Sequence, residues 1–285
     1  MRISKEQLAI IDSLRCERLS SDEKNLREIS SFYNSRNDNL VEPLRNEAYQ
    51  EDENGEVAYY LIKNENGEIL FYFSLKCGLL YDHYIDDEKL QLVRDMLKYL
   101  LELKKDPTVS QEDKQSIDLI FEKLRSRKGI TKADVEKIKK NDGNRAIDSI
   151  EREFDRGFQK VGETFAGIEL VQFCANDNCR GLWNDFQLGR KMGVVVFWHF
   201  VVPIVLKVME FVGCRYLFLF AADLSEDEDL VNYYRTDLLF EDAEDRGTAI
   251  PIYDDTCKFM YQESANLKQK QEYFYANFNR DENAV

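Results

Sequence analysis

The sequence predicts an α/β protein with a mixed central sheet flanked by helices and an all-helical insertion between the two halves of that core. Strand-like runs rich in β-branched and aromatic residues occur within 57–76 and return after 165. Charged, heptad-like segments replace them between Asp86 and Lys160. We therefore expect residues 1–85 and 161–285 to form one core and residues 86–160 to form a helical insertion.

The first half of the core is expected to combine helices with a hairpin. Capping-box spacings pair Ser4 with Gln7 and Ser20 with Glu23, which predicts two or three helices within 4–48. Strands at 57–63 and 68–76 are joined by Asn-Glu-Asn-Gly, a strong hairpin signal, and should be antiparallel neighbours.

The second half reads as two buried strands on either side of a long apolar helix, followed by a short helix and two closing strands. The two buried strands should be parallel because a crossover helix joins them. Ser225 with Glu228 is placed to cap the short helix. The strands are expected at 165–175, 215–223, 247–255 and 257–262.

Composition restricts the class of protein. The chain has 285 residues, 44% of them hydrophobic, so it can bury a sizeable core. A net charge of -15 repels phosphate backbones and makes nucleic acid a disfavoured partner. The first residues lack the apolar core of a signal peptide, and the six cysteines are scattered, so we expect a cytoplasmic protein with reduced thiols.

Metal and nucleophile chemistry are disfavoured by the scarcity of histidine. His83 and His199 are the only two, so the close pair Cys174 and Cys179 lacks the partners of a metal site. His199 interrupts the most apolar run, Gly193 to Leu206, which is too short for a membrane span and is expected to be a buried helix with a core or groove histidine.

A phosphate-binding turn is predicted where this helix begins. The segment Leu188 to Val194 combines two glycines with Arg190 and Lys191 at a helix N-terminus. Glycines allow a tight turn whose amide groups point at one spot, and the helix dipole adds partial positive charge there. A loop without a binding function remains the alternative explanation of this pattern.

These residues resemble the pyrophosphate loop of the GNAT superfamily of N-acetyltransferases, Q/R-x-x-G-x-G/A. Arg190-x-x-Gly193-x-Val195 matches its first two fixed positions and departs at the third, where Val replaces a small residue. A rival alignment starts the loop at Asn178-Cys179-Arg180-Gly181. The resemblance implies that acetyl-CoA contacts Leu188, Gly189, Arg190, Lys191, Met192, Gly193 and Val194.

A second resemblance involves the short helix. Tyr233-Tyr234 followed by Phe240 is similar to the aromatic-Tyr pair and Gly-Phe of that superfamily, although Leu239 replaces the Gly. The resemblance implies that Tyr234 protonates the departing CoA thiolate. It also implies a gap between the two parallel strands in which the backbone of Val171, Phe173 and Cys174 contacts the thioester.

Glu169 is the candidate base, since it is a carboxylate in an otherwise apolar strand and burial would raise its pKa. It is equally well explained as a surface residue, and water can replace a dedicated base. Strand alternation puts Glu169, Val171 and Phe173 on one face, without saying which face meets the substrate.

We therefore expect an acetyl-CoA-dependent N-acetyltransferase without a metal, acting on a primary amine by direct transfer. Acidic segments such as SEDEDL suit a polyamine, an aminoglycoside or a peptide amine as the acceptor. The alternative is an inactive acyl-CoA-binding or protein-interaction module. A homodimer and the role of the insertion are left open.

Overall fold

The computed structural model describes residues 2–35, 38–84, 99–115, 117–118, 161–223, 225, 227–242 and 257–279. The chain divides into two compact units. Unit 1 comprises 1–78, 166–244 and 250–285, and unit 2 comprises 79–165 and 245–249. In unit 2, residues 99–105, 111–115 and 117–118 are helical. The rest of the expected insertion, and the strand expected at 247–255, lie outside the described residues.

A seven-stranded mixed sheet forms the framework of the chain, in the order β1-β2-β3-β4-β5-β7-β6. The hairpin of β2 and β3 is antiparallel, β4 and β5 are parallel, and β7 is antiparallel to β5, so the expected α/β fold class is confirmed. The strands are β1 (Arg15–Arg18), β2 (Ala58–Lys63), β3 (Ile69–Tyr84), β4 (Val161–Ala175), β5 (Tyr216–Ala221), β6 (Glu241–Asp242) and β7 (Lys258–Glu263).

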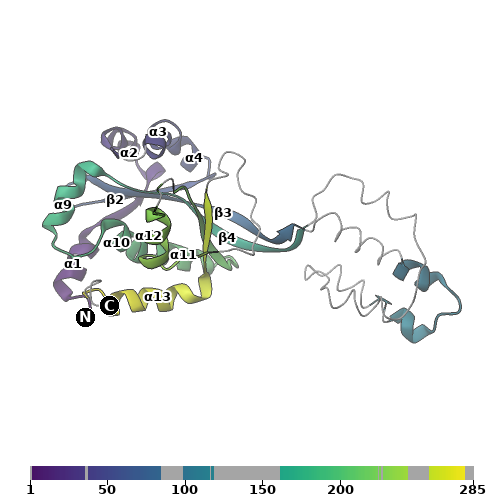
Figure 1. Ribbon diagram of the computed structural model, residues 1–285. Helices are drawn as coiled ribbons and strands as arrows, with labels where there is room; N and C mark the ends of the chain where they lie inside the picture. Colours follow the sequence, from purple (N-terminus) through teal and green to yellow (C-terminus); the bar gives the residue numbers. More distant parts are fainter. Residues whose placement is uncertain are drawn as a thin grey trace. The chain divides into compact units, whose positions relative to one another are not determined.

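Helices cover both faces of the sheet, with α2, α3 and α4 on one face and α10, α11 and α13 on the other (Figure 1). The helices are α1 (Lys5–Ser13), α2 (Glu23–Glu28), α3 (Asp38–Asn46), α4 (Ala48–Glu53), α9 (Arg180–Asp185), α10 (Met192–Val196), α11 (Val202–Met209), α12 (Asp229–Thr236) and α13 (Ser264–Ala276). The predicted capping box at Ser4 and Gln7 is present. The short strand β1 and the helix α13 have no counterpart in the predictions.

Each face of the sheet has its own apolar core. The larger core lies under α10, α11, α12 and α13, and the smaller one lies under α2, α3 and α4. Ile168 and Leu170 of β4 point into the larger core, whereas Cys174 of the same strand belongs to the smaller one. Strand β4 therefore contributes to both cores and lies at the centre of the molecule's packing.

The long apolar helix is continuous from Met192 to Met209 and includes a π-helical turn at Phe197–Val201. Among the described residues it is the one helix long and apolar enough to cross a membrane, with a mean hydropathy of 2.1 over 18 residues, so its length alone does not exclude a span. Half of that window is buried inside the fold. Val195, Val201 and Val205 are fully buried, as expected of a core helix.

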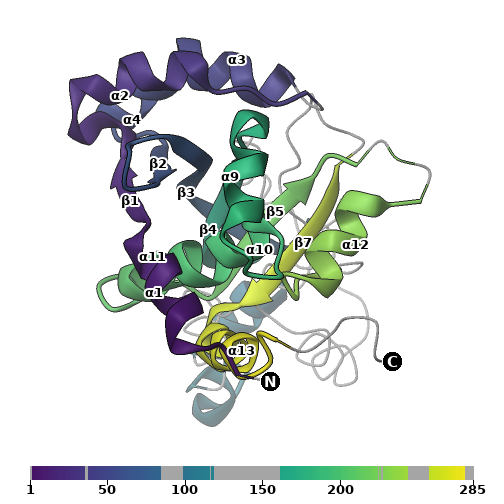
Figure 2. The ribbon, with the colours of Figure 1, turned by 90° about the vertical axis from the view of Figure 1, so that its left-hand side faces the viewer.

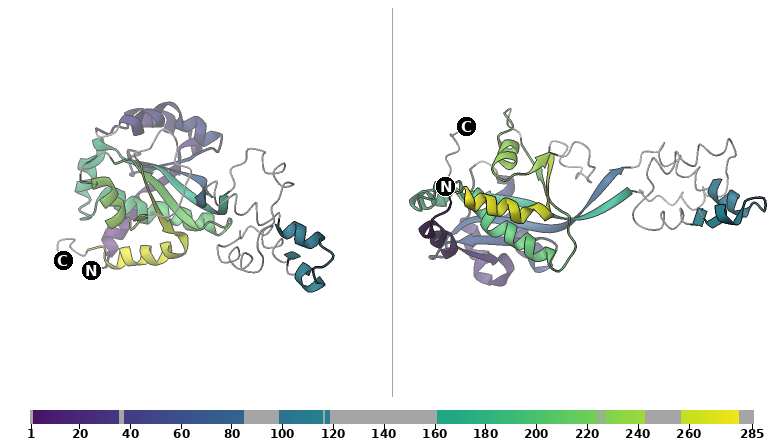
Figure 3. Two further views of the ribbon diagram at one scale, coloured as in Figure 1. Left: turned by 45° about the vertical axis from the view of Figure 1, so that its right-hand side comes forward. Right: turned by 90° about the horizontal axis from the view of Figure 1, so that it is seen from below.

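The C-terminal helix α13 lies along α11, as the right-hand view of Figure 3 shows. The described ends of the chain also meet, since the amide of Ile3 donates to the carbonyl of Tyr275 at 3.0 Å. Figure 2 shows α1 beside α13 at this junction. Helix α13 therefore connects the start of the chain with the long apolar helix.

Candidate functional site

The parallel strands β4 and β5 separate part-way along their length. Their ladder pairs Gly167, Ile168 and Glu169 with Tyr216, Leu217 and Phe218. Both strands are described throughout, and beyond this point they continue, to Ala175 and Ala221, without pairing with each other. Unpaired strand backbone carries N–H and C=O groups that need partners. The gap expected from the sequence is therefore present where β4 leaves β5.

Strand β4 contains an extra residue at the point of separation. On the face away from α10, Glu169 contacts Lys76, whereas Gln172 accepts a hydrogen bond from Ser74. In a regular strand, neighbouring side chains on one face are two residues apart, as Ser74 and Lys76 are in β3. Glu169 and Gln172, on the same face of β4, are three residues apart. The shift is the mark of a β-bulge, which commonly re-aims a strand near functional sites.

Because of the bulge, the expected alternation of side chains along β4 is wrong at this point. Glu169 and Phe173 do not share a face: Phe173 packs against Phe71 and Phe197 in the larger core, and Glu169 lies on the opposite face. Val171 lies at this shift, between Leu170 of the larger core and Gln172, which contacts Ser74. The backbone of 171–174 is thus directed differently from the rest of β4, in the segment predicted to contact a thioester.

The start of α10 leaves backbone donors available. Lys191 is the N-cap residue, and its side chain forms no capping hydrogen bond. The carbonyl of Lys191 accepts hydrogen bonds from the amides of Val194 and Val195. The amides of Met192 and Gly193 donate to no other residue that the structure describes. Free amides at a helix start are suited to bind an anion.

The turn before α10 adopts the tight geometry that its glycines suggested. Gln187 and Gly189 both have positive φ, 49° and 68°, a region that costs little for glycine. Leu188, Met192 and Val194 bury their side chains in the core. These three residues can therefore meet a ligand mainly through their backbone, as the prediction assumed.

The two cations of the turn have different surroundings. Lys191 is largely exposed, pairs with Asp237 at 2.7 Å and lies over the ring of Tyr233. Arg190 donates from Nε to the carbonyl of Phe278 at 2.6 Å and from Nη2 to the carbonyl of Asn277 at 2.9 Å. Arg190 is thus bound to the end of α13, a partner that local sequence could not reveal.

In the rival alignment, Arg180 and Gly181 begin α9 rather than the long helix. Arg180 forms an ion pair with Asp177 three residues earlier. A Cβ added to Gly181 would meet nothing within 4 Å. This glycine therefore marks no close approach within the described structure, in contrast to Gly193.

Gly193 is tightly packed by two aromatic residues. A Cβ added there would lie 2.5 Å from the hydroxyl oxygen of Tyr233 and 3.2 Å from the ring of Phe173. A side chain at this position would therefore have to displace the hydroxyl of Tyr233, whether or not a phosphate approaches. The hydroxyl of Tyr233, rather than that of Tyr234, lies at the start of α10.

Tyr234 lies toward the ends of the separated strands. It is buried, packs against Phe240, and burial raises the pKa of its phenol, with further contributions from Cys174 and Asp223. Cys174 is near the end of β4, and Asp223 follows β5. The hydroxyl therefore keeps its proton at neutral pH and can serve as a hydrogen-bond or proton donor.

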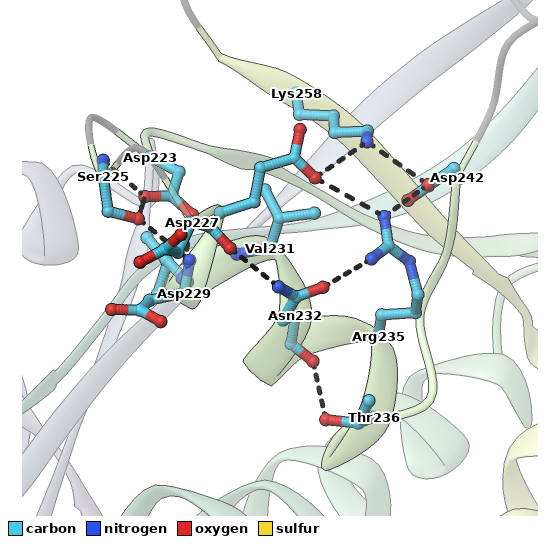
Figure 4. A network of polar contacts seen from close by, with 12 residues as sticks. Asp223, Ser225, Asp227, Asp229, Val231, Asn232, Arg235, Thr236, Asp242 and Lys258 are labelled. Atoms are coloured by element: carbon cyan, nitrogen blue, oxygen red, sulfur yellow. Dashed lines mark hydrogen bonds and ion pairs between the residues drawn. The ribbon is translucent and has the colours of Figure 1, made fainter.

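Asp223 fixes the helix that carries both tyrosines (Figure 4). Its Oδ2 accepts from the amides of Leu230 and Val231 at 2.8 and 2.9 Å. Although partial burial opposes the shift, hydrogen bonds from Ser225 and these amides lower the pKa of Asp223. The aspartate thus occupies the capping role at the start of α12.

The capping box predicted for this helix pairs Ser225 with Glu228, and the prediction is wrong for Glu228. Glu228 has φ 52° and makes no side-chain capping bond, because the chain turns sharply there. Ser225 Oγ does accept from the amide of Asp229 at 2.9 Å. At the far end of the helix, Leu239 has φ 59°, a left-handed conformation that glycine adopts at little cost.

Glu169 is partly buried, with 13% of its side chain exposed, and its Oε2 lies 3.4 Å from Nζ of Lys76. Burial raises the pKa of this carboxyl, and Lys76 opposes the shift. Glu169 lies on the sheet face away from α10, at the last paired position of β4 and β5. It remains a candidate base on the side opposite the helix start.

No group of three or more metal-ligating side chains occurs in the part of the chain that the structure describes. His199 lies in the π-helical turn, where Nδ1 is 2.7 Å from the hydroxyl of Tyr275 and Nε2 is 3.2 Å from Asp12. Burial lowers the pKa of this histidine, and Asp12 opposes the shift. His199 thus joins three helices, as a partly buried core histidine does.

Comparisons with known proteins give structural similarities alone. No protein-family model matches the sequence, and no curated protein matches it. A crystal structure of a KacT mutant is 12% identical, with a TM-score of 0.46 over 90% of this chain and 99% of that one. AtaTR bound with AcCoA is 10% identical, with a TM-score of 0.46 over 91% and 98%.

AtaT complexed with acetyl-methionyl-tRNAfMet is 11% identical, with a TM-score of 0.45 over 90% of this chain and 98% of that one. At such identities and TM-scores the chemistry has to be argued from this chain's own residues. Those residues form a mixed sheet in which the parallel strands β4 and β5 separate part-way along their length.

Proposed function

We propose that this chain is an acetyl-CoA-dependent N-acetyltransferase that transfers the acetyl group directly to a primary amine. The observation that carries the proposal is the bulged separation of β4 from β5 next to free amides at the start of α10. One feature suits the thioester and the other suits the pyrophosphate of a single extended cofactor.

The proposed reaction needs no metal ion and uses groups of this chain. The amine nitrogen attacks the thioester carbonyl, and the backbone of Val171 to Cys174 supplies hydrogen bonds to the cofactor. The C–S bond breaks as the tetrahedral intermediate collapses, and the thiolate takes the proton of Tyr234. The amine proton leaves to Glu169 or through water.

A thiol-release assay with an amine panel tests the proposal. The panel contains polyamines, aminoglycosides, peptides with lysine or a free N-terminus, and aminoacyl-tRNA. The net charge of the chain disfavours nucleic acid as a partner. However, one of the compared structures is a complex with a tRNA and another is a complex with DNA. Aminoacyl-tRNA in the panel tests this expectation directly. Acetylation of any amine member, shown by mass spectrometry, would support transfer, whereas failure to bind any CoA ester in calorimetry would overturn the proposal.

A second candidate is an acyl-CoA-binding module without turnover. The observation in its favour is the packing of the Tyr233 hydroxyl at Gly193, which places a side chain where the GNAT loop keeps space for phosphate. Tight CoA binding without acetyl transfer to any amine in the panel would favour this candidate.

We further propose that residues 86–160 form a separate lobe that selects the acceptor. The support is the change in sequence texture and the helical structure of the described part of this segment. Replacing the segment with a short linker should preserve folding and acetyl-CoA binding while changing the acceptor profile. Loss of folding after the replacement would show that these helices belong to the main core.

A further inference from the structure

The turn before α10 is held in place from two sides through residue 190. The indole Nε1 of Trp183, in α9, donates to the carbonyl of Arg190 at 2.9 Å. The guanidinium of Arg190 donates to the carbonyls of Asn277 and Phe278, the first two residues after α13. Trp183 belongs to the helix just before the turn, but Asn277 and Phe278 are far from it in sequence, so the turn depends on tertiary contacts.

The Arg190 contacts bind the carbonyls of Asn277, the C-cap residue of α13, and of Phe278, the residue after it. A guanidinium presents several donors in a fixed plane, so one side chain can bind two neighbouring carbonyls. Phe278 is 1% exposed, so this acceptor is also shielded from water.

Helix α13 holds the long helix at two further points. Gln271 donates from Nε2 to the carbonyl of Trp198 at 2.6 Å, and the hydroxyl of Tyr275 meets Nδ1 of His199. Both contacts lie in the π-helical turn, where the regular backbone bonding changes. Contacts from α13 thus extend from the turn at Arg190 to the middle of the helix.

We infer that Arg190 is a positioning residue, which uses the two carbonyls that follow α13 to hold the turn whose amides bind the cofactor phosphate. The inference rests on the proposed function for the identity of the ligand. It assigns the arginine of the GNAT-like motif to bracing the loop rather than to contact with phosphate, and it makes α13 part of the cofactor site.

Two substitutions distinguish a brace from a phosphate ligand. Arg190→Lys keeps the positive charge but cannot bind two carbonyls in the same planar arrangement, and Arg190→Gln removes the charge. A brace predicts that both variants weaken acetyl-CoA binding by a similar factor, about tenfold, with little dependence on salt. A phosphate ligand predicts that Lys retains most of the affinity and that Gln loses it mainly at low salt.

Hydrogen exchange of the protein without cofactor provides a readout independent of binding. Both Arg190 variants should speed amide exchange in 188–194 while β2 and β3 remain protected. Arg180→Gln is the matched control, because it removes a nearby arginine that pairs with Asp177 and should leave exchange in the turn unchanged.

Unchanged exchange in 188–194 in both variants would overturn the inference, as would near-normal affinity in Arg190→Lys. If no CoA ester binds the parent protein, the proposed function fails, and hydrogen exchange still decides whether Arg190 braces the turn.

Discussion

The starts of α10 and α12 differ in how their backbone donors are used. At α12, Asp223 and Ser225 accept hydrogen bonds from the amides of 229–231. At α10 there is no side-chain cap, and the amides of Met192 and Gly193 donate to no described residue. One helix start is satisfied by the chain, and the other is open to a ligand.

This difference implies different duties for the two helices. A capped helix gives a fixed platform, and α12 carries Tyr233 and Tyr234. An uncapped helix start presents positive potential and unused donors, which suits an anionic cofactor group. Changes at Tyr234 and at the cap of α12 should therefore affect turnover and stability, and changes at the start of α10 should affect cofactor affinity.

The largest expected effect is on turnover, from removing one hydroxyl of α12. Tyr234→Phe should lower kcat by about 10²- to 10⁴-fold, the usual contribution of general acid catalysis, with the cofactor dissociation constant nearly unchanged. Steady-state kinetics on an acceptor found in the amine panel, together with calorimetry, would measure both quantities.

Tyr233→Phe is the matched control for this experiment. Its hydroxyl lies at Gly193, so its loss should change cofactor affinity more than kcat. A large kcat defect in Tyr233→Phe beside normal turnover in Tyr234→Phe would show that the acid is Tyr233. Normal turnover in both would mean that the thiolate leaves without help from either residue.

The next largest effect is expected at the open helix start. Gly193→Asp should weaken acetyl-CoA binding by about 30-fold, corresponding to the roughly 2 kcal/mol that a charge at a helix end contributes in favourable geometry. Because any Cβ there would clash with the hydroxyl of Tyr233, the change should be made in the Tyr233→Phe background.

Gly193→Ala in the same background separates bulk from charge. If it weakens binding as much as Gly193→Asp does, the effect is steric and the helix start does not act through its charge. Unchanged affinity in a folded Gly193→Asp variant would remove α10 from the site.

A smaller effect is expected from removing the cap of α12. Asp223→Ala should lower the free energy of unfolding by about 1 kcal/mol, the usual cost of losing an N-cap side chain, and Asp223→Asn should retain most of it. Chemical denaturation measures both variants. Equal stability of Asp223→Ala and the parent would show that α12 does not depend on this cap.

The smallest expected effect concerns Glu169 and depends on pH. Burial raises the pKa of the Glu169 carboxyl in the folded protein, so folding favours the protonated form. The contribution of Glu169 to stability therefore declines as the pH rises above 4.5, the ordinary pKa of a glutamate. As the pH rises from 4 to 7, the stability of Glu169→Gln should therefore increase relative to that of the parent. The increase should be small because the variant loses the ion pair with Lys76.

Thermal unfolding at several pH values checks this, with Glu65→Gln in the exposed hairpin turn as the control. A relative loss of stability for Glu169→Gln as pH rises would show that the pair with Lys76 outweighs burial.

The elements with strong local signals were predictable from sequence. The hairpin, the two parallel strands and the helix beginning near Gly193 each have a clear apolar pattern, and all are present. The strand β1 was missed because its sequence, Arg-Cys-Glu-Arg, is mostly charged. It forms because it pairs with β2, a tertiary effect that overrides local propensity.

The details of the site depended on contacts that the sequence does not display. Arg190 looked like a phosphate ligand because it adjoins a glycine turn, yet its side chain binds carbonyls beyond α13. Asp223 was overlooked as a cap because it precedes the helix by several residues and reaches it across a loop. Spacing rules describe contiguous turns, so both long-range partners lay outside their scope.

The extra residue in β4 also has an evolutionary consequence. Deleting one residue at Val171 would restore simple alternation along the strand and allow it to pair with β5 for its full length. The resulting sheet would be more regular, and the opening between the strands would close. Through this one position, a lineage could lose the proposed thioester site in a single genetic event while keeping a folded protein.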